Sequence, residues 1–406
     1  YKMVNYSVVK IQQIKLNLHY IKKKRKKSQK TYKLQAININ INKKKEIMKN
    51  TIKTLIVMLS SISLFSTANA GELTVTGTAK ATYNMTSGYH SLTSGGASTG
   101  LGIANEFDLG AKGELDNGIT WNYQIQMDPG NSGATTAADV QNDDSRLEIT
   151  LPSYGTLGIY ISEGGLDLED GASQSVYGRP TDIGANDGVQ DNYDVDAYNN
   201  MQLHTSAGLL PYGLQFKVGY VPATGGVYGS SNTAGTAYTK VADGVGRTAT
   251  AAQIKANPIE GLNVGLSTVQ FSGLMSTGMT QEPASYAAMA TYARGAFTVG
   301  YSQAVREAAM SANAHTQGIV QQHNQSNASV SFLVNDSLSV SYEVEKSEQE
   351  QNNRGLVHTE QKSEALQAAY TMGGMTLALS HGRYDNVGYV VDKEAGQTLL
   401  AVTMAF

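Results

Sequence analysis

Carboxylates are the reactive side chains most concentrated in one stretch of this chain. Residues 163–200 hold nine acids and a single base, Arg179. The acids are Glu163, Asp167, Glu169, Asp170, Asp182, Asp187, Asp191, Asp194 and Asp196. The stretch follows neither a helical nor a strand period, and an irregular segment of this length is usually functional or disordered. Carboxylates so closely spaced can concentrate cations in a narrow passage or bind a divalent cation.

Other residues capable of chemistry are poorly arranged for it. The chain has no Cys, which excludes disulfides, thiol nucleophiles and thiolate metal sites. Ser98 lies in a G-x-S-x-G match, but within a Gly/Ser-rich segment that lacks the strand and helix of a nucleophile elbow. The histidines are scattered, and Gly188 is misplaced for an EF-hand loop. We expect no catalytic residue, no metal site and no cofactor; calcium on the acidic loop and a hydrolase built on Ser98 stay open alternatives.

Strands are the elements that must position the acidic stretch. Apolar or small side chains alternate with Thr and Lys over residues 73–83, and the pattern repeats over 106–115 and 119–127. A period of two gives a strand with one apolar and one polar face. Thirteen further segments bring the expected number to sixteen, an even number as a closed antiparallel barrel requires. They are 145–151, 157–162, 200–206, 213–221, 247–256, 262–270, 285–294, 296–305, 324–334, 338–347, 362–372, 375–383 and 396–406.

The expected connections alternate between short turns and long polar loops, as in outer-membrane barrels. Turns such as 152–155 and 373–374 are short, whereas loops such as 163–199 and 222–246 are long. Sixteen strands enclose a lumen too wide for side chains to fill. We therefore predict an all-β, 16-stranded antiparallel transmembrane barrel, with its polar face toward water and its apolar face toward lipid.

The first 70 residues differ from the rest. They hold 16 Lys+Arg and one acid, so the remainder, with 15 basic and 33 acidic residues, carries a net charge of −18. We expect residues 1–47 to be a translated upstream region without structure, and not a nucleic-acid-binding arm. Residues 48–70 have the basic start, the largely apolar run and the small-residue cleavage site of a secretory signal peptide, with cleavage after Ala70.

Residues 71–406 resemble the general diffusion porins of Gram-negative bacteria, particularly the alphaproteobacterial type. The resemblance rests on the start GELTVTG at 71–77, the segment YGTLGI at 154–159 before the longest loop, the sixteen strands and the terminal Phe406. It implies a water-filled channel whose third long loop folds into the lumen and forms the constriction. In this sequence that loop is 163–200.

The resemblance also implies roles for single residues. Acids on the loop are set against bases on the facing wall, which makes the nine acids the constriction acids. Lys80, Lys112 and Arg146 fall on the polar face of their strands and are the expected facing-wall bases. Phe406 is the expected signal for the outer-membrane barrel assembly machinery, and the family implies a homotrimer.

Together these observations predict a porin of the Gram-negative outer membrane, without enzymatic activity, for passive diffusion of small hydrophilic solutes and ions. The acid-rich loop favours cations, because a narrow section lined by one sign concentrates counter-ions. Two alternatives stay open. One is a substrate-selective channel for sugars or anions, and the other is a surface or adhesive β-protein without transport.

Overall fold

The computed structural model describes most of the chain after residue 70. The described residues are 71–88, 99–115, 117–129, 140–183, 191–206, 208–222, 224, 248–273, 279–311, 320–351 and 358–406. The expected upstream region 1–47 and signal peptide 48–70 lie outside them, as do Ser98 and Asp187. Within these ranges, no helix has the length and apolar character needed to cross a membrane.

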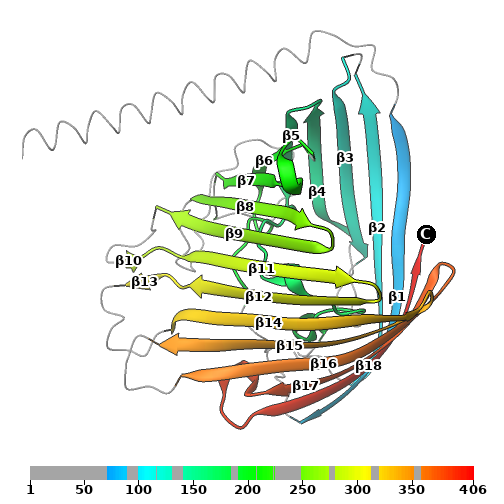
Figure 1. Cartoon of the computed structure of the whole chain (residues 1–406), viewed down its shortest axis with the longest axis vertical. Coiled ribbons are helices and arrows are strands. Elements are labelled where there is room, and N and C mark those ends of the chain that lie inside the picture. The colour runs from blue at the N-terminus through cyan, green and yellow to red at the C-terminus, as the bar shows by residue number, and fades with distance from the viewer. Residues whose placement is uncertain are drawn as a thin grey trace, which may run out of the picture. The chain divides into compact units, whose positions relative to one another are not determined.

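Sixteen strands close into one antiparallel barrel, which confirms the expected architecture (Figure 1). Successive barrel strands pair with each other, and β1 closes the ring by pairing with β18 as well as with β2. The strands are β1 (Glu72–Gly88), β2 (Gly100–Glu114), β3 (Thr120–Pro129), β4 (Val140–Leu151), β5 (Gly155–Ile161), β6 (Asn200–Thr205), β7 (Gln215–Val221), β8 (Thr248–Ile259), β9 (Leu262–Ser272), β11 (Ala284–Arg294), β12 (Phe297–Glu307), β14 (Val320–Asn335), β15 (Leu338–Gln351), β16 (Thr359–Met372), β17 (Met375–Asp385) and β18 (Glu394–Ala405).

Short elements complete the described part of the chain. Strands β10 (Met279–Gln281) and β13 (Met310–Ser311) form a separate two-stranded sheet beyond the ends of β11 and β12 (Figure 1). The helical turns are η1 (Asp170–Ala172), α2 (Pro180–Ile183), η2 (Pro211–Gly213) and η4 (Val387–Tyr389). Two of them, η1 and α2, belong to the acidic stretch between β5 and β6.

The two faces of the barrel wall separate by polarity, because successive side chains of a strand point to opposite faces. Large apolar side chains on the outer face are exposed, with Leu101 at 85% and Leu73 at 74%. Inward-facing Gln202 and Gln367 are only 1% exposed, although they are polar. This is the division expected of a wall between lipid and an aqueous interior.

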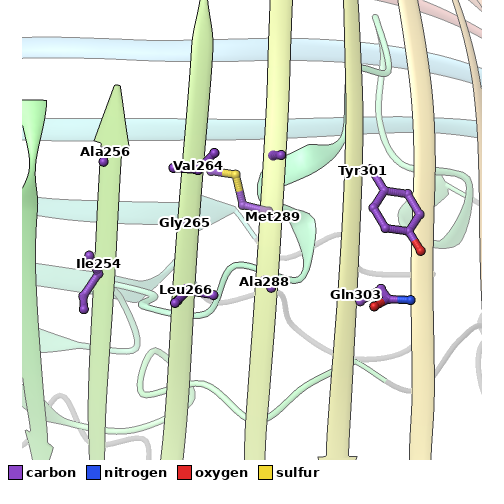
Figure 2. A pocket seen from close by; sticks show the side chains of 10 residues that line it. Ile254, Ala256, Val264, Gly265, Leu266, Ala288, Met289, Tyr301 and Gln303 are labelled. Carbon is purple, nitrogen blue, oxygen red and sulfur yellow. The ribbon is translucent and has the colours of Figure 1, made fainter. Parts of the chain in front are cut away.

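The outer face has a shallow hollow over β8, β9, β11 and β12 (Figure 2). It forms where Ala256 and Ala288 lie between the larger Ile254, Leu266 and Tyr301. The lining is apolar apart from one glutamine, and Ile254, Leu266 and Tyr301 are exposed on the outer wall. The hollow is therefore a feature of the face expected to meet lipid, separate from the interior.

The barrel closes at a close approach between Gly77 and Phe406. These residues exchange two backbone hydrogen bonds, with N···O distances of 2.9 and 3.0 Å. The Phe406 ring also packs against the Phe107 ring at a centroid distance of 5.7 Å. A Cβ atom at Gly77 would lie 2.9 Å from Phe406 Cζ and 2.5 Å from the Glu106 carbonyl oxygen. Only glycine leaves room for this contact.

Replacing Gly77 by Val should destabilise the barrel by about 1–3 kcal/mol, because the new side chain overpacks the closing seam. The free energy of unfolding can be measured by urea titration of the folded protein in detergent micelles, using the fluorescence of its single tryptophan, Trp121. The matched control is Ala79→Val, which adds apolar bulk on the same strand and face. Equal unfolding midpoints for the two variants would contradict this account of the seam.

Candidate functional site: the constriction loop

The described residues of the segment between β5 and β6, 162–183 and 191–199, run along the inner wall of the barrel. Gln253 on β8 donates its side-chain amide to the Leu166 carbonyl oxygen at 3.0 Å. Ser302 on β12 donates to the Glu169 carbonyl oxygen at 2.7 Å. Farther round the wall, the Tyr384 hydroxyl on β17 donates to the Pro180 carbonyl oxygen at 3.0 Å. We call residues 162–199 the constriction loop, and these contacts place it inside the barrel.

The inner wall also accepts hydrogen bonds from the backbone N–H groups of the loop. The acceptors are polar side chains at inward positions of the strands. The bonds are Leu168 N to Ser267 Oγ (2.9 Å), Tyr193 N to Ser285 Oγ (2.7 Å), Val176 N to Ser341 Oγ (3.0 Å), Tyr177 N to Gln367 Oε1 (3.0 Å) and Thr181 N to Glu345 Oε2 (2.8 Å). Because a buried backbone group needs a partner, these inward residues hold the loop in place.

Beneath the loop the inward face is partly apolar, which differs from the expected uniformly polar lining. Loop residues Leu166 and Val195 pack into a cluster with Val269 and Phe271, both of which are at most 2% exposed. A second cluster joins Leu168 to inward apolar residues of β11 and β12. The loop shields this sector from water, so apolar side chains can face inward there without exposure.

Three of the nine predicted acids are structural. Asp194 accepts hydrogen bonds from the backbone N–H groups of Leu166 and Asp167, each at 2.8 Å. Asp167 accepts from the Glu169 N–H at 2.7 Å, and Glu169 accepts from the Asn192 N–H at 2.6 Å. Burial disfavours the charged form and raises the pKa of Asp194 to about 7 and that of Glu169 to about 8. These carboxyls fix the shape of the loop instead of lining the pore.

Three other acids surround the loop's one base. The Arg179 side chain is 5% exposed and contacts Asp170, Asp182 and Asp191. Its Nη2 lies 3.0 Å from Asp191 Oδ1, and its Nε lies 2.9 Å from Oε1 of the buried wall residue Glu345. The side chains of Asp170, Asp182 and Asp191 are 62%, 56% and 64% exposed. Arg179 therefore ties the loop to β15, while three carboxylates around it are open to water.

Two of the remaining acids, Glu163 and Asp196, lie near the two ends of the loop. Glu163 forms an ion pair with Arg146 of β4, with 2.6 Å between Oε1 and Nη1. Asp196 is exposed and lies close to Asp194, since a Cβ atom built on Gly165 would be within 3.2 Å of both carboxyl groups. The ninth acid, Asp187, lies outside the described residues.

The three predicted facing-wall bases have different surroundings. The Lys80 Nζ lies 5.4 Å from the centre of the Tyr177 ring of the loop, and Arg146 pairs with Glu163 at the start of the loop. Lys112 instead pairs with Glu72 at 3.0 Å, two residues from the end of β2 at the short-turn rim. Lys80 and Arg146 thus reach the constriction loop, whereas Lys112 belongs to the rim.

The wall also supplies acids that the sequence reasoning did not single out. Glu345 contacts Arg179, and Glu343 accepts hydrogen bonds from the hydroxyls of Ser173 and Ser175, each at 2.6 Å. Both lie on the inward face of β15, in alternation with outward Tyr342 and Val344. The sequence could have indicated both residues, because each is an acid at an inward position of the expected strand 338–347. None of the described His, Cys, Asp and Glu residues is grouped in threes as a metal site would require.

Comparison with known proteins places this geometry in a known fold. No protein-family model and no curated sequence matches the chain. Several solved structures match the barrel. Salmonella typhi OmpF, in a complex with daunomycin, has a TM-score of 0.57 at 12% identity, covering 83% of this chain and 98% of its own. The DcaP outer membrane channel of Acinetobacter baumannii has a TM-score of 0.57 at 12% identity, covering 84% and 99%.

A third match is the anion-selective porin of Comamonas acidovorans, with a TM-score of 0.56 at 12% identity over 83% of this chain and 100% of that one. The fold is that of the outer-membrane porins. At these identities the likeness concerns the fold alone. An anion-selective protein shares this porin fold, so the selectivity of the present chain must be argued from the side chains around its own loop.

Removing Arg179 should release the loop, because Glu345 would be left as a buried charge without a base. Breaking such a buried pair costs about 3–5 kcal/mol. We expect Arg179→Gln to make the loop sensitive to a protease of broad specificity, measured by the rate of cleavage within residues 162–199. Arg383→Gln is the control, since that side chain is 59% exposed and its ion pair contributes less than about 1 kcal/mol. Equal cleavage rates for the two variants would contradict the proposal that Arg179 ties the loop to β15.

Raising the pH should loosen the loop, because Glu169 would have to ionise while buried. The pKa of Glu169 is raised from 4.5 to about 8 in the folded protein. Protonated Glu169 therefore stabilises the fold fully below pH 4.5, and this stabilisation is lost as the pH rises through about 8. Glu169→Gln keeps an acceptor for the Asn192 N–H and cannot ionise. We expect its thermal midpoint to fall less than that of the wild type between about pH 6 and about pH 9. The exposed Glu360→Gln serves as the control, and identical pH profiles would refute the role of Glu169.

Proposed function

We propose that this protein is a porin of the Gram-negative outer membrane that lets small hydrophilic solutes and ions diffuse passively, with a preference for cations. One observation carries the proposal. Three water-exposed carboxylates, Asp170, Asp182 and Asp191, gather on the loop inside a closed barrel around a base that is itself buried. Their shared base offsets part of their charge, which leaves a net negative surface beside the lumen.

The wall across from the loop carries charges of both signs. Lys80 lies over the Tyr177 ring, and Arg146 is paired with Glu163. Two further inward positions of this wall are acids, Asp108 on β2 and Glu148 on β4. A passage lined by one sign of charge concentrates counter-ions, and low-dielectric walls strengthen the effect. The acids of this wall therefore offset its bases, which leaves the exposed loop acids as the source of the proposed cation preference.

The outer face supports a membrane setting over the adhesive alternative. An adhesive β-protein without a membrane would pack its large apolar side chains inside. Here Leu366 and Leu400 on the outer wall are 60% and 47% exposed, whereas the inward Gln361 and Ser363 are fully buried. A substrate-selective channel stays compatible with the fold.

Assembly and export belong to the same proposal. We propose that residues 48–70 direct export and are cleaved off after Ala70, and that residues 1–47 are a translated upstream region. The position of Phe406 at the closing seam supports its expected role in recognition by the assembly machinery. A homotrimer is consistent with the trimer form described for Vibrio cholerae OmpT, which matches this chain with a TM-score of 0.54 at 11% identity over 83% of it and 100% of that chain.

Neutralising the exposed loop acids tests the proposed selectivity. We expect the triple variant Asp170→Asn, Asp182→Asn, Asp191→Asn to lower the ratio of cation to anion permeability several-fold, measured as the reversal potential in a potassium chloride gradient across a planar bilayer. The preference of the wild type should also weaken at about 1 M salt, where the Debye length is about 3 Å.

The control removes the same number of charges from the outer face, as Glu360→Gln, Asp385→Asn and Glu394→Gln. This triple variant should keep the wild-type reversal potential. An unchanged reversal potential in the loop variant would count against these acids as the source of selectivity. A folded protein that gives no conductance in the bilayer would refute the porin function as a whole.

A further inference from the structure

A row of polar side chains crosses the inner wall toward the long-loop end of the barrel. The strand register places Ser285 beside Arg306, Arg306 beside His323, and His323 beside Gln349. Arg306 lies four residues after Ser302 on β12, whose hydroxyl bonds to the constriction loop, so both point into the barrel. The row therefore presents a guanidinium to the lumen above the loop contacts.

The constriction loop holds an aromatic ring against that guanidinium. The Arg306 Cζ lies 4.1 Å from the centre of the Tyr193 ring. The Tyr193 ring packs edge-on against Phe271 at a centroid distance of 5.1 Å, and its backbone N–H donates to Ser285 Oγ at 2.7 Å. The ring is thus fixed from two sides. A guanidinium held over a ring face keeps N–H donors available for a carboxylate.

Within the described part of the chain, Arg306 differs from the inward-facing arginines Arg146 and Arg179, because it has no carboxylate partner. Arg146 pairs with Glu163, and Arg179 contacts four acids. Among the residues that the structure describes, Arg306 makes no ion pair. A half-buried guanidinium without an acid, in an acid-rich interior, is placed to bind the carboxylate of a passing solute.

An exposed acid lies close by along the chain. Asp191 precedes Tyr193 by two residues, a span of at most about 7 Å between Cα atoms. Its side chain is 64% exposed and is oriented by Arg179. The intervening Asn192 fixes the segment, since its N–H donates to Glu169 and its side-chain amide donates to the Tyr286 carbonyl oxygen at 3.4 Å. One segment therefore carries both the ring that stacks on Arg306 and, two residues earlier, an exposed acid.

We propose that Arg306, Tyr193 and Asp191 form a binding site for small zwitterionic solutes, namely amino acids and short peptides. The solute carboxylate binds the N–H groups of Arg306, and its ammonium group lies against Asp191. The inference rests on the proposed porin function, because the site can act only on solutes that enter the lumen. The site makes the channel selective among diffusing solutes. The negative surface of the loop repels simple anions, whereas a zwitterion has no net charge and finds an opposite charge for both its carboxylate and its ammonium group.

The test measures solute entry into liposomes that contain the purified protein. Glycylglycine is the zwitterionic probe, and N-acetylglycinamide is an uncharged probe of similar size. We expect glycylglycine flux to saturate with concentration and the flux of the uncharged probe to stay linear. Arg306→Gln and Asp191→Asn should each raise the half-saturating glycylglycine concentration by about tenfold or more, as expected for the loss of a charge-assisted hydrogen bond.

Lys255→Gln is the matched control for Arg306→Gln. It removes one positive charge from an inward position of β8, where none of the described loop residues stacks a ring on it, and should leave the half-saturating concentration unchanged. Equal effects of the two variants would overturn the proposal, because they would reflect net charge alone. An effect of Arg306→Gln without one of Asp191→Asn would also overturn it, in favour of a simple carboxylate site.

The two probes separate this proposal from the porin function. Entry of N-acetylglycinamide together with a linear glycylglycine flux would refute the binding site and leave the porin function standing. Exclusion of both probes by folded protein in the liposomes would refute both.

Discussion

A segment folded inside a barrel must find a hydrogen-bond partner for each backbone group that it removes from water. The constriction loop meets this requirement with inward side chains of the wall. Ser329 donates to the Ala172 carbonyl oxygen at 2.7 Å, and Gln367 donates to that of Gly178 at 2.6 Å while accepting from Tyr177. The polar alternation of strands β8 to β16 therefore has a second purpose besides facing water, since it holds the loop.

The same requirement divides the acids of the loop. Carboxylates that accept backbone N–H groups, such as Asp194, are drawn into the loop and desolvated, which raises their pKa. Carboxylates around Arg179 keep contact with water, because the guanidinium that pairs with them is on their buried side. An acid-rich segment thus yields both a rigid scaffold and a charged surface. The count of acids in the sequence overstates the charge available to ions.

Sequence reasoning predicted the sixteen strands, their two faces and the irregular segment between the fifth and sixth, because strand phase is a local property of alternating residues. The partners of individual side chains depend on contacts far apart in the chain. Glu345 and Arg179 belong to distant segments, and nothing near Lys112 in sequence indicated that Glu72 would neutralise it. The apolar cluster around Phe271 was not predicted for the same reason, because the loop residues that cover it are distant in sequence.

The central claim is that the loop rests against the inner wall of β15 in a protein that conducts ions. The chain has no Cys, so the double variant Val176→Cys, Ser341→Cys can be oxidised without side reactions. The Val176 N–H donates to Ser341 Oγ at 3.0 Å, which places the Val176 backbone beside the Ser341 side chain. The decisive measurement is single-channel conductance before and after oxidation. The account predicts a disulfide with unchanged conductance, whereas failure to cross-link the folded protein, or a conductance abolished by the cross-link, would contradict it.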